Sequence, residues 1–133
     1  MNAHANTGTV LDRILEARRA EVDHRKKVLP ETALKYGVKA ASPVRDFAAA
    51  LSRDALNVLA ELKPASPSRG IIRNPFDAPG LGKALEMAGA AALSVLTEGE
   101  FFRGSLKNLR DARKEIALPV LRKDFIFDPL QVW

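Results

Sequence analysis

The sequence predicts an α/β fold built on parallel strands. Short apolar runs at residues 55–62, 91–97 and 118–125 are typical of buried strands, and residues 76–90 and 105–116 have the patterning of helices. Each helix is long enough to cross from one strand to the next, which favours parallel strands. Doubly wound sheets and closed eight-stranded barrels both begin with such strand–helix repeats.

Residues 1–54 are predicted to form an all-helical section ahead of the first strand. Apolar residues at helical spacing predict a helix over residues 8–28. Shorter helices are expected at residues 31–37, where Gly37 would stop the first of them, and at residues 44–53.

Residues with a preference for helix ends support these boundaries. Thr7 or Thr9 can cap the first helix. Asp77 and Ser105 stand at the starts of the two crossover helices, and Gly89 follows the end of the first of these. The local sequence therefore agrees with the pattern of apolar residues.

The chain ends inside an expected element. Residues 128–133 open a third helix, and the sequence stops at Trp133. Three parallel strands leave open apolar sheet edges, which are a liability in an isolated domain. We therefore expect residues 55–133 to be the first strand–helix units of a longer protein.

Composition excludes several classes of protein. The 133 residues are 47% hydrophobic and 28% charged, which is typical of one globular domain. The absence of cysteine excludes disulfides, thiolate metal sites and a cysteine nucleophile, and it suits a reducing cytoplasm. Neither a secretory signal nor an apolar run of membrane-spanning length is recognisable.

The basic balance favours an anionic partner but not nucleic acid or a membrane. The net charge is +5 and the isoelectric point is near 9.8. The densest basic run, residues 24–28, is short and is better explained as the charged C-terminal end of a helix. His4 and His24 are expected at the surface, because neither has the neighbours that a metal site needs.

Charged residues follow two of the apolar strands. Glu61 and Lys63 are two apart, so their side chains point to the same side of the first strand. Arg122, Lys123 and Asp124 end the third strand. A salt bridge explains the first pair alone, but a second lysine at a second strand end points to a site for a phosphorylated or carboxylated substrate.

The loop after the first strand has the groups that bind phosphate. Residues 64–75 supply two hydroxyls, a backbone N–H at Gly70 and two guanidinium groups. The hydroxyls belong to Ser66 and Ser68, and the guanidinium groups belong to Arg69 and Arg73. The loop is longer than most strand-to-helix connections, and long loops of this kind are usually functional. The pattern matches no established nucleotide-binding motif.

Three phenylalanines accompany these strand ends. Phe101 and Phe102 lie in the loop after the second strand, and Phe125 follows Lys123 by two residues. Taken singly, each is better explained as packing under its own loop. Together, they would form walls for a flat ring.

Three segments resemble those of a known family, the indole-3-glycerol-phosphate synthases of tryptophan biosynthesis. These segments are ELKPASPSRG, AGAAALSVLTEGEFFRGS and LPVLRKDFIFDPLQV, in that order, and the likeness extends from about Leu11 to Trp133. The resemblance implies a (β/α)8 TIM barrel with an N-terminal helical extension. It implies ring closure of 1-(2-carboxyphenylamino)-1-deoxyribulose 5-phosphate, with release of CO2 and water and without a metal or organic cofactor.

The resemblance also implies roles for individual residues. Lys123 matches the general acid that acts on the substrate carbonyl. Lys63 matches the lysine that contacts the anionic groups and takes part in dehydration, and Glu61 matches the glutamate that orients the lysines. Ser66 matches a serine of the phosphate-binding loop.

The same resemblance implies a role for two of the phenylalanines and for one proline. Pro67, Phe102 and Phe125 match residues that line the anthranilate pocket. A phosphate or sulfate ion is expected to occupy the substrate site. The full-length enzyme is expected to be a monomer. The 133-residue piece is expected to self-associate through its open edges.

Two other functions are compatible with the residues. One is another phosphate-binding barrel enzyme, such as phosphoribosylanthranilate isomerase, against which the strand end with Lys123 argues. The other is a non-catalytic basic interaction module that uses residues 8–28, which would leave the apolar strands after residue 55 unexplained.

We predict that the 133-residue chain alone lacks synthase activity. A TIM barrel needs roughly 250 residues, and the later strands of the family carry further catalytic and phosphate-binding groups. A turnover assay on the purified 133-residue chain checks this, and measurable ring closure would contradict it.

Overall fold

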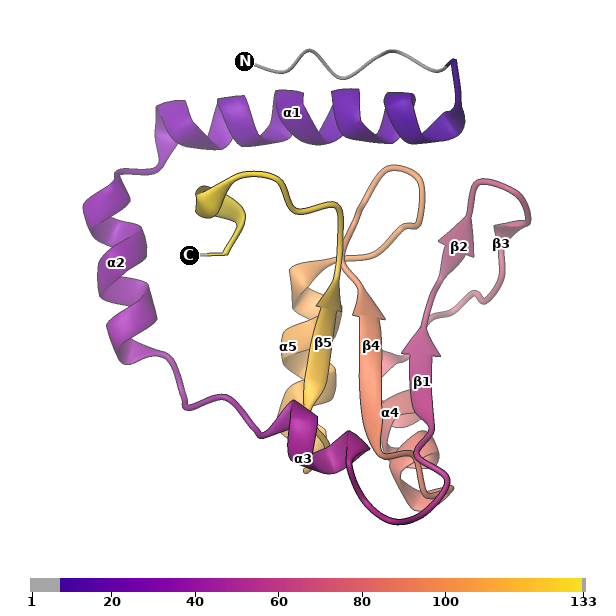
Figure 1. The fold of residues 1–133 in the computed structure, drawn as a ribbon. Coiled ribbons are helices and arrows are strands. Elements are labelled where there is room, and N and C mark those ends of the chain that lie inside the picture. The colour runs from indigo at the N-terminus through magenta and orange to yellow at the C-terminus, as the bar shows by residue number, and fades with distance from the viewer. Residues whose placement is uncertain (1–7, 133) are drawn as a thin grey trace. The chain divides into compact units, whose positions relative to one another are not determined.

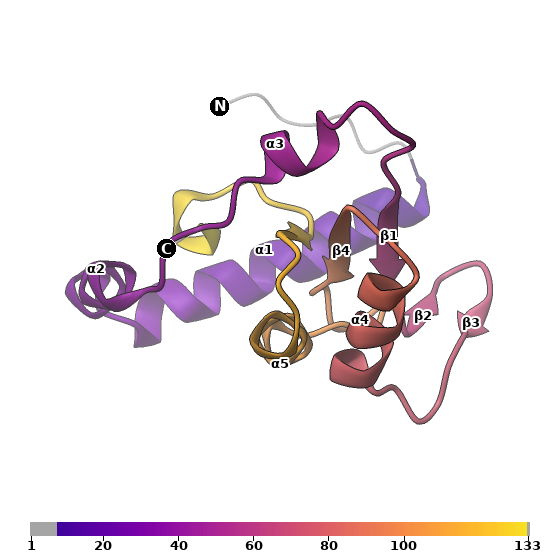
Figure 2. The same ribbon diagram turned by 90° about the horizontal axis from the view of Figure 1, so that it is seen from below.

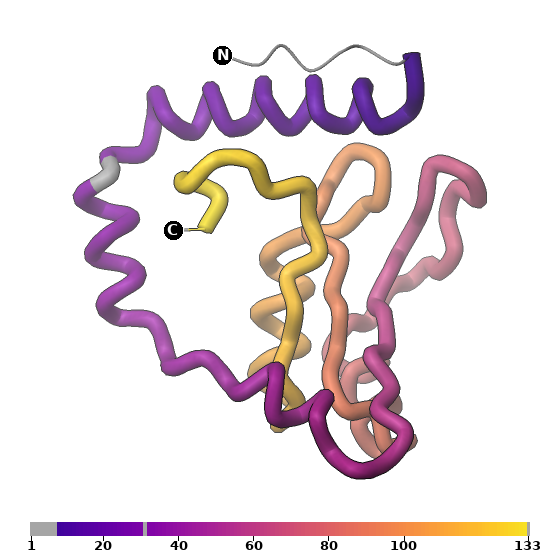
Figure 3. Tube along the Cα trace, viewed as in Figure 1, coloured from indigo at the N-terminus to yellow at the C-terminus, as the bar shows by residue number. Residues whose placement is uncertain are grey.

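The computed structural model describes residues 8–132, apart from the side chain of residue 31 (Figure 3). The chain divides into two compact units. The larger unit contains residues 43–124, and the smaller contains residues 8–42 together with 125–132. Among the described residues, no helix has both the length and the apolar character needed to cross a membrane.

The larger unit is built on a parallel three-stranded sheet. Its order is β1 (Leu59–Leu62), β4 (Ala92–Leu96) and β5 (Val120–Lys123), so the predicted parallel strands are confirmed. Helices α4 (Ala78–Met87) and α5 (Leu106–Glu115) join them and pack on the same face of the sheet (Figures 1 and 2).

The core lies between this sheet face and the two helices. Leu62, Leu93 and Val95 of the strands pack with Ala112 and Ile116 of α5 and its C-terminal cap. Burying such side chains stabilises the fold by about 1.5–3 kcal/mol for each large aliphatic group. The core therefore fixes the sheet to its helices.

The strands differ in how completely they are buried. β4 is buried along its whole length, as predicted for a buried strand. The same prediction is wrong for β1, where Leu59 is 41% exposed, and Leu121 on β5 is 42% exposed. β1 and β5 are the edge strands, and these residues alternate with the core-facing ones.

The predicted caps of the crossover helices are confirmed. The Asp77 carboxylate accepts from the Gly80 N–H at 3.1 Å, and the Ser105 hydroxyl accepts from the Asn108 N–H at 3.0 Å. Gly89 has a φ of +89° after α4, a conformation that favours glycine. Each helix therefore begins and ends within three residues of the predicted limit.

The loop after β1 contains a small hairpin that the sequence analysis did not predict. β2 (Ala65–Ser66) pairs antiparallel with β3 (Gly70–Ile71). Gly70 closes the turn with a φ of +65°. Two-residue strands carry too few side chains for an alternating pattern to show in the sequence.

A short helix, α3 (Phe47–Leu51), is tied to the end of the sheet where the strands begin (Figure 1). It is shorter than the predicted 44–53, because Asp46 caps it by accepting from the Ala49 N–H at 2.8 Å. The Arg45 guanidinium donates to the carbonyl of Leu118 at 2.8 Å, just before β5. α3 therefore groups with the sheet unit, and a domain boundary at residue 54 stays a prediction.

The smaller unit contains α1 (Val10–Val28), α2 (Glu31–Ala40) and a 3₁₀ turn, η1 (Pro129–Gln131). The long first helix is confirmed, with Thr9 as its N-cap, while Thr7 lies outside the described residues.

Two predicted limits in the smaller unit are wrong. α2 continues three residues past Gly37, because glycine inside a helix costs only about 1 kcal/mol and does not end it. The third helix expected from residue 128 is a single 3₁₀ turn in the described residues, where Asp128 accepts from the Leu130 N–H at 3.0 Å.

An ion pair joins two distant segments of the smaller unit. The Lys26 ammonium near the end of α1 bonds to the Asp128 carboxylate. The hydrogen bond from Lys26, followed by that from the Leu130 N–H, lowers the pKa of Asp128 below 3.8. The same ion pair raises the pKa of Lys26 above 10.5.

We predict that the Asp128 pKa rises toward 3.8 in Lys26→Met. The carboxylate is favoured in the folded state, so the ion pair stabilises the fold above pH 3.8 and loses its effect as the pH falls through the lowered pKa. Carboxyl-carbon NMR of aspartate-labelled full-length protein checks this. An Asp128 pKa unchanged by the substitution would contradict it.

Candidate functional site

The candidate site lies where the three parallel strands end. All three C-terminal ends meet at one edge of the sheet, and two loops rise from it (Figure 1). One is residues 63–77 with the β2–β3 hairpin, and the other is residues 97–105 between β4 and α5. In α/β folds this edge is where ligands bind.

Glu61 and Lys63 form an ion pair at the end of β1. The Lys63 Nζ lies 2.7 Å from the Glu61 Oε1, and about one third of each side chain is exposed. Leu62 between them is buried in the core, so the pair occupies the opposite face of the sheet, as predicted. The contact also fits a purely structural salt bridge, so it does not by itself assign a function.

Lys123 lies level with Lys63 on the far side of β4. Leu62 pairs with Val95, and Leu96 pairs with Lys123, so Lys63, the residue just after β1, is at the same height as Lys123. Two strand spacings separate the backbones by about 10 Å. Long lysine side chains at that spacing can reach one anionic ligand from both sides.

A polar network surrounds the backbone on either side of Lys123. The Thr97 hydroxyl donates to Asp124 Oδ2 at 2.6 Å. Arg122 donates from Nε to the Thr97 hydroxyl at 3.2 Å and from Nη2 to Asp124 Oδ2 at 2.9 Å. The Asp124 side chain is fully buried, so the ends of β4 and β5 are fixed to each other.

The hairpin gathers hydroxyl groups at its turn. The Ser66 Oγ accepts from the Arg69 N–H at 3.2 Å and lies 3.4 Å from the Ser68 Oγ. Pro67, Ser68 and Arg69 are exposed, and Ser66 is half-buried. The turn therefore presents hydroxyl and guanidinium groups to solvent, as a phosphate-binding loop does.

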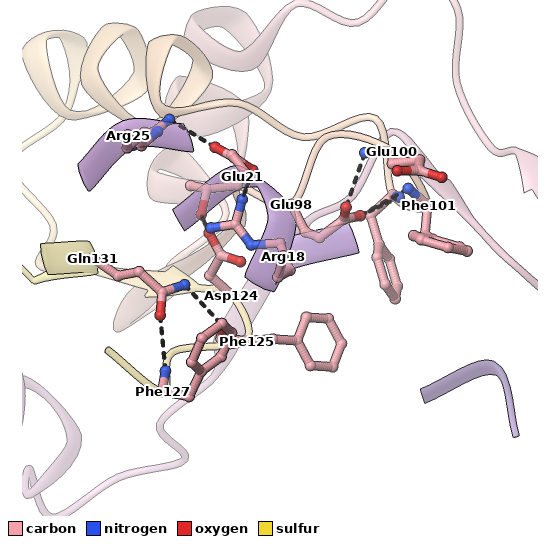
Figure 4. Close-up of polar contacts among 12 residues, drawn as sticks. Arg18, Glu21, Arg25, Glu98, Glu100, Phe101, Asp124, Phe125, Phe127 and Gln131 are labelled. Atoms are coloured by element: carbon pink, nitrogen blue, oxygen red, sulfur yellow. Dashed lines mark hydrogen bonds and ion pairs between the residues drawn. The ribbon is translucent and has the colours of Figure 1, made fainter. Parts of the chain in front are cut away.

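The two loops are joined through their backbones. The Ala65 N–H donates to the Phe102 carbonyl at 3.1 Å. Phe101 and Phe102 are half-buried. Phe125 belongs to the smaller unit, where its carbonyl accepts from Gln131 Nε2 at 2.9 Å (Figure 4), and its predicted place in a ring pocket stays a prediction.

Comparison with known proteins decides the family. The model of the family described as indole-3-glycerol phosphate synthase matches residues 11–133. The chain belongs to this family. It therefore has the strand–helix order with which the TIM barrel of the indole-3-glycerol phosphate synthases begins, and the predicted fold class is confirmed.

Curated relatives that carry the name of this family have similar sequence identity to the chain. The chain is 46% identical over 127 residues to indole-3-glycerol phosphate synthase of Mycobacteroides abscessus, with 96% of this chain and 47% of the relative covered. It is 44% identical over 131 residues to that of a Roseiflexus species, covering 93% of this chain and 49% of the relative. The chain thus spans about half the length of these relatives.

The sequence analysis did not identify one buried carboxylate at the candidate site. Glu98, the second residue after β4, is 1% exposed and accepts from the N–H groups of Glu100, Phe101 and Phe102 at 2.9, 2.8 and 2.9 Å (Figure 4). An acidic residue followed by glycine at the end of a fully buried strand was the available signal.

Metal ligation has no support in the part of the chain that the structure describes. Groups of three or more histidine, cysteine, aspartate or glutamate side chains that could hold an ion are absent there. His24 is exposed, as predicted, and His4 lies outside the described residues.

We predict that Gly104→Ala destabilises the loop between β4 and α5. A Cβ at Gly104 would lie 2.2 Å from the Leu96 carbonyl oxygen and 2.9 Å from that of Glu98, so the backbone has to shift at a cost of about 1–3 kcal/mol. Denaturant unfolding of the full-length protein measures this. The control is Gly99→Ala, whose Cβ meets nothing closer than 3.7 Å, and an equal loss of stability in both variants would contradict the prediction.

Proposed function

We propose that the full-length protein is an indole-3-glycerol phosphate synthase. The reaction closes the pyrrole ring of 1-(2-carboxyphenylamino)-1-deoxyribulose 5-phosphate and releases CO2 and water, as a carbon–carbon lyase of tryptophan biosynthesis. The observation that carries the proposal is the pair of lysines level with each other at two strand ends, in a chain that belongs to this family.

Ring closure needs a proton donor and a countercharge. We assign the donor role to Lys123, which protonates the carbonyl oxygen that the new carbon–carbon bond converts to a hydroxyl. General acid catalysis of this kind contributes about 10²–10⁴-fold to the rate. The fixed backbone at Thr97 and Asp124 supports this assignment, because it limits where the Lys123 side chain can begin.

Glu61 and Lys63 act together in the proposed reaction. Lys63 contacts the anionic groups of the substrate and takes part in the loss of water. Glu61 orients its ammonium group, which the 2.7 Å contact supports, and takes part in proton transfer. One face of β1 would thus provide both a cation for the substrate and a base beside it.

The hairpin and the aromatic residues complete the proposed substrate site. Ser66 binds phosphate oxygens, and phosphate or sulfate ions compete for the same place. Pro67, Phe102 and Phe125 line the pocket for the anthranilate ring. The exposed hydroxyls at the hairpin turn and the backbone bond to Phe102 support this arrangement on the larger unit.

The remaining expectations concern the whole protein. We propose a helical extension over residues 1–54 and the first strand–helix units of the barrel over residues 55–133. We also propose a cytoplasmic monomer whose partner is its small-molecule substrate, with neither nucleic acid nor membrane bound.

We predict that Lys123→Met in the full-length protein lowers kcat by about 10²–10⁴-fold, because the general acid is lost. Steady-state assays of indole-3-glycerol phosphate formation measure this. The matched control is Lys107→Met on α5, whose side chain is 78% exposed and bonds to Asp111. An unchanged kcat in Lys123→Met would remove Lys123 from the mechanism, and an inactive wild-type protein would contradict the proposed function itself.

A further inference from the structure

Glu98 is a buried charge whose oxygens are taken up by backbone. Oε1 accepts from the Glu100 N–H, and Oε2 accepts from the N–H groups of Phe101 and Phe102 (Figure 4). Burying a carboxylate is costly unless it is hydrogen-bonded, and hydrogen bonds to a charged acceptor are about twice as strong as neutral ones. Such a residue enforces one backbone shape on the loop.

The backbone of Glu98 also binds the C-terminal end of that loop. The Gly104 N–H donates to the Glu98 carbonyl at 2.7 Å. Arg103, just before it, has a φ of +52°, a conformation uncommon for residues other than glycine. The loop over residues 99–104 is therefore closed around Glu98 from both sides.

Phe102 connects Glu98 to the other loop, the one that contains the β2–β3 hairpin. Its N–H is bound by Glu98 Oε2 at 2.9 Å, and its carbonyl accepts from the Ala65 N–H at 3.1 Å. Ala65 is 3% exposed and directly precedes Ser66. Two successive hydrogen bonds therefore link the Glu98 carboxylate to the start of the hairpin.

We propose that Glu98 is a positioning residue that sets the shape of both substrate-binding loops at once. It acts through the backbone and does not touch the substrate. The inference rests on the proposed function, because it assigns substrate binding to these loops. Its consequence is that substrate affinity depends on Glu98, whereas the lysines on the strands keep their places without it.

The test uses Glu98→Gln in the full-length protein, with Glu100→Gln as the matched control. Glutamine has the same shape, but one acceptor becomes an NH2 group that faces a backbone N–H. Glu100 is an exposed neighbour in the same loop, and it contacts Glu98 through its backbone N–H. The readouts are amide hydrogen exchange, resolved by peptide, and steady-state kinetics.

Glu98→Gln is expected to raise exchange about tenfold in residues 99–104 and also in residues 64–70, since a lost bond to a charged acceptor is of that order. Exchange in β4 stays unchanged. KM rises about tenfold, and kcat stays within about threefold of the wild type because the lysines keep their places. Glu100→Gln matches the wild type in both measurements.

Glu98→Asp keeps the charge and both oxygens, so it is expected to recover most of the substrate affinity. Increased exchange confined to residues 99–104 would overturn the coupling of the two loops. A fall in kcat with KM unchanged, or loss of folding in both variants, would overturn the positioning role. Exchange is measured without substrate, so an inactive wild-type protein with the expected exchange pattern would reject the proposed function and leave the loop coupling intact.

Discussion

The parallel register of β1, β4 and β5 is the constraint on which the site depends. Because Leu62, Val95 and Arg122 are level with one another, the residues that follow each strand leave the sheet at the same height. Two lysines more than 50 residues apart in the chain are thereby brought to one edge. A register shifted by one residue would turn one of them toward the helices.

Alternation along the strands separates stability from chemistry. Leu62 and Val95 face α4 and α5 and form the core, while Glu61 and Lys63 point the other way. A substitution on one face therefore changes packing, and a substitution on the other changes charge. This separation lets the β1 end carry an ion pair without placing it in the apolar layer.

Local signals in the sequence were sufficient for the elements and for part of the site. Asp77 and Ser105 cap helices because a side chain reaches a backbone N–H three residues away, and such contacts are visible in sequence. The pairing of Glu61 with Lys63 is equally local. The residue-by-residue roles in ring closure came from resemblance to the family and not from these patterns.

Features that depend on distant partners could not be predicted. Thr97 meets Asp124 across 27 residues, and the Ala65 N–H donates to a carbonyl in the loop after β4. Gly37 shows that a local signal can also mislead. Glycine has a poor preference for helices, yet Gly37 lies inside α2. Residue type alone does not report which of several possible partners a buried group will meet.

The bond between Ala65 and Phe102 uses main-chain atoms only. The donor and the acceptor are therefore present whichever side chain stands at position 102, whereas Ala65 is buried and leaves little room for a larger one. For protein engineering, this means that the exposed turn residues 67–69 and positions 101 and 102 can be randomised in a library without removing the backbone bond that joins the two loops. Such a library would vary the walls of the proposed ring pocket while its backbone link stays the same.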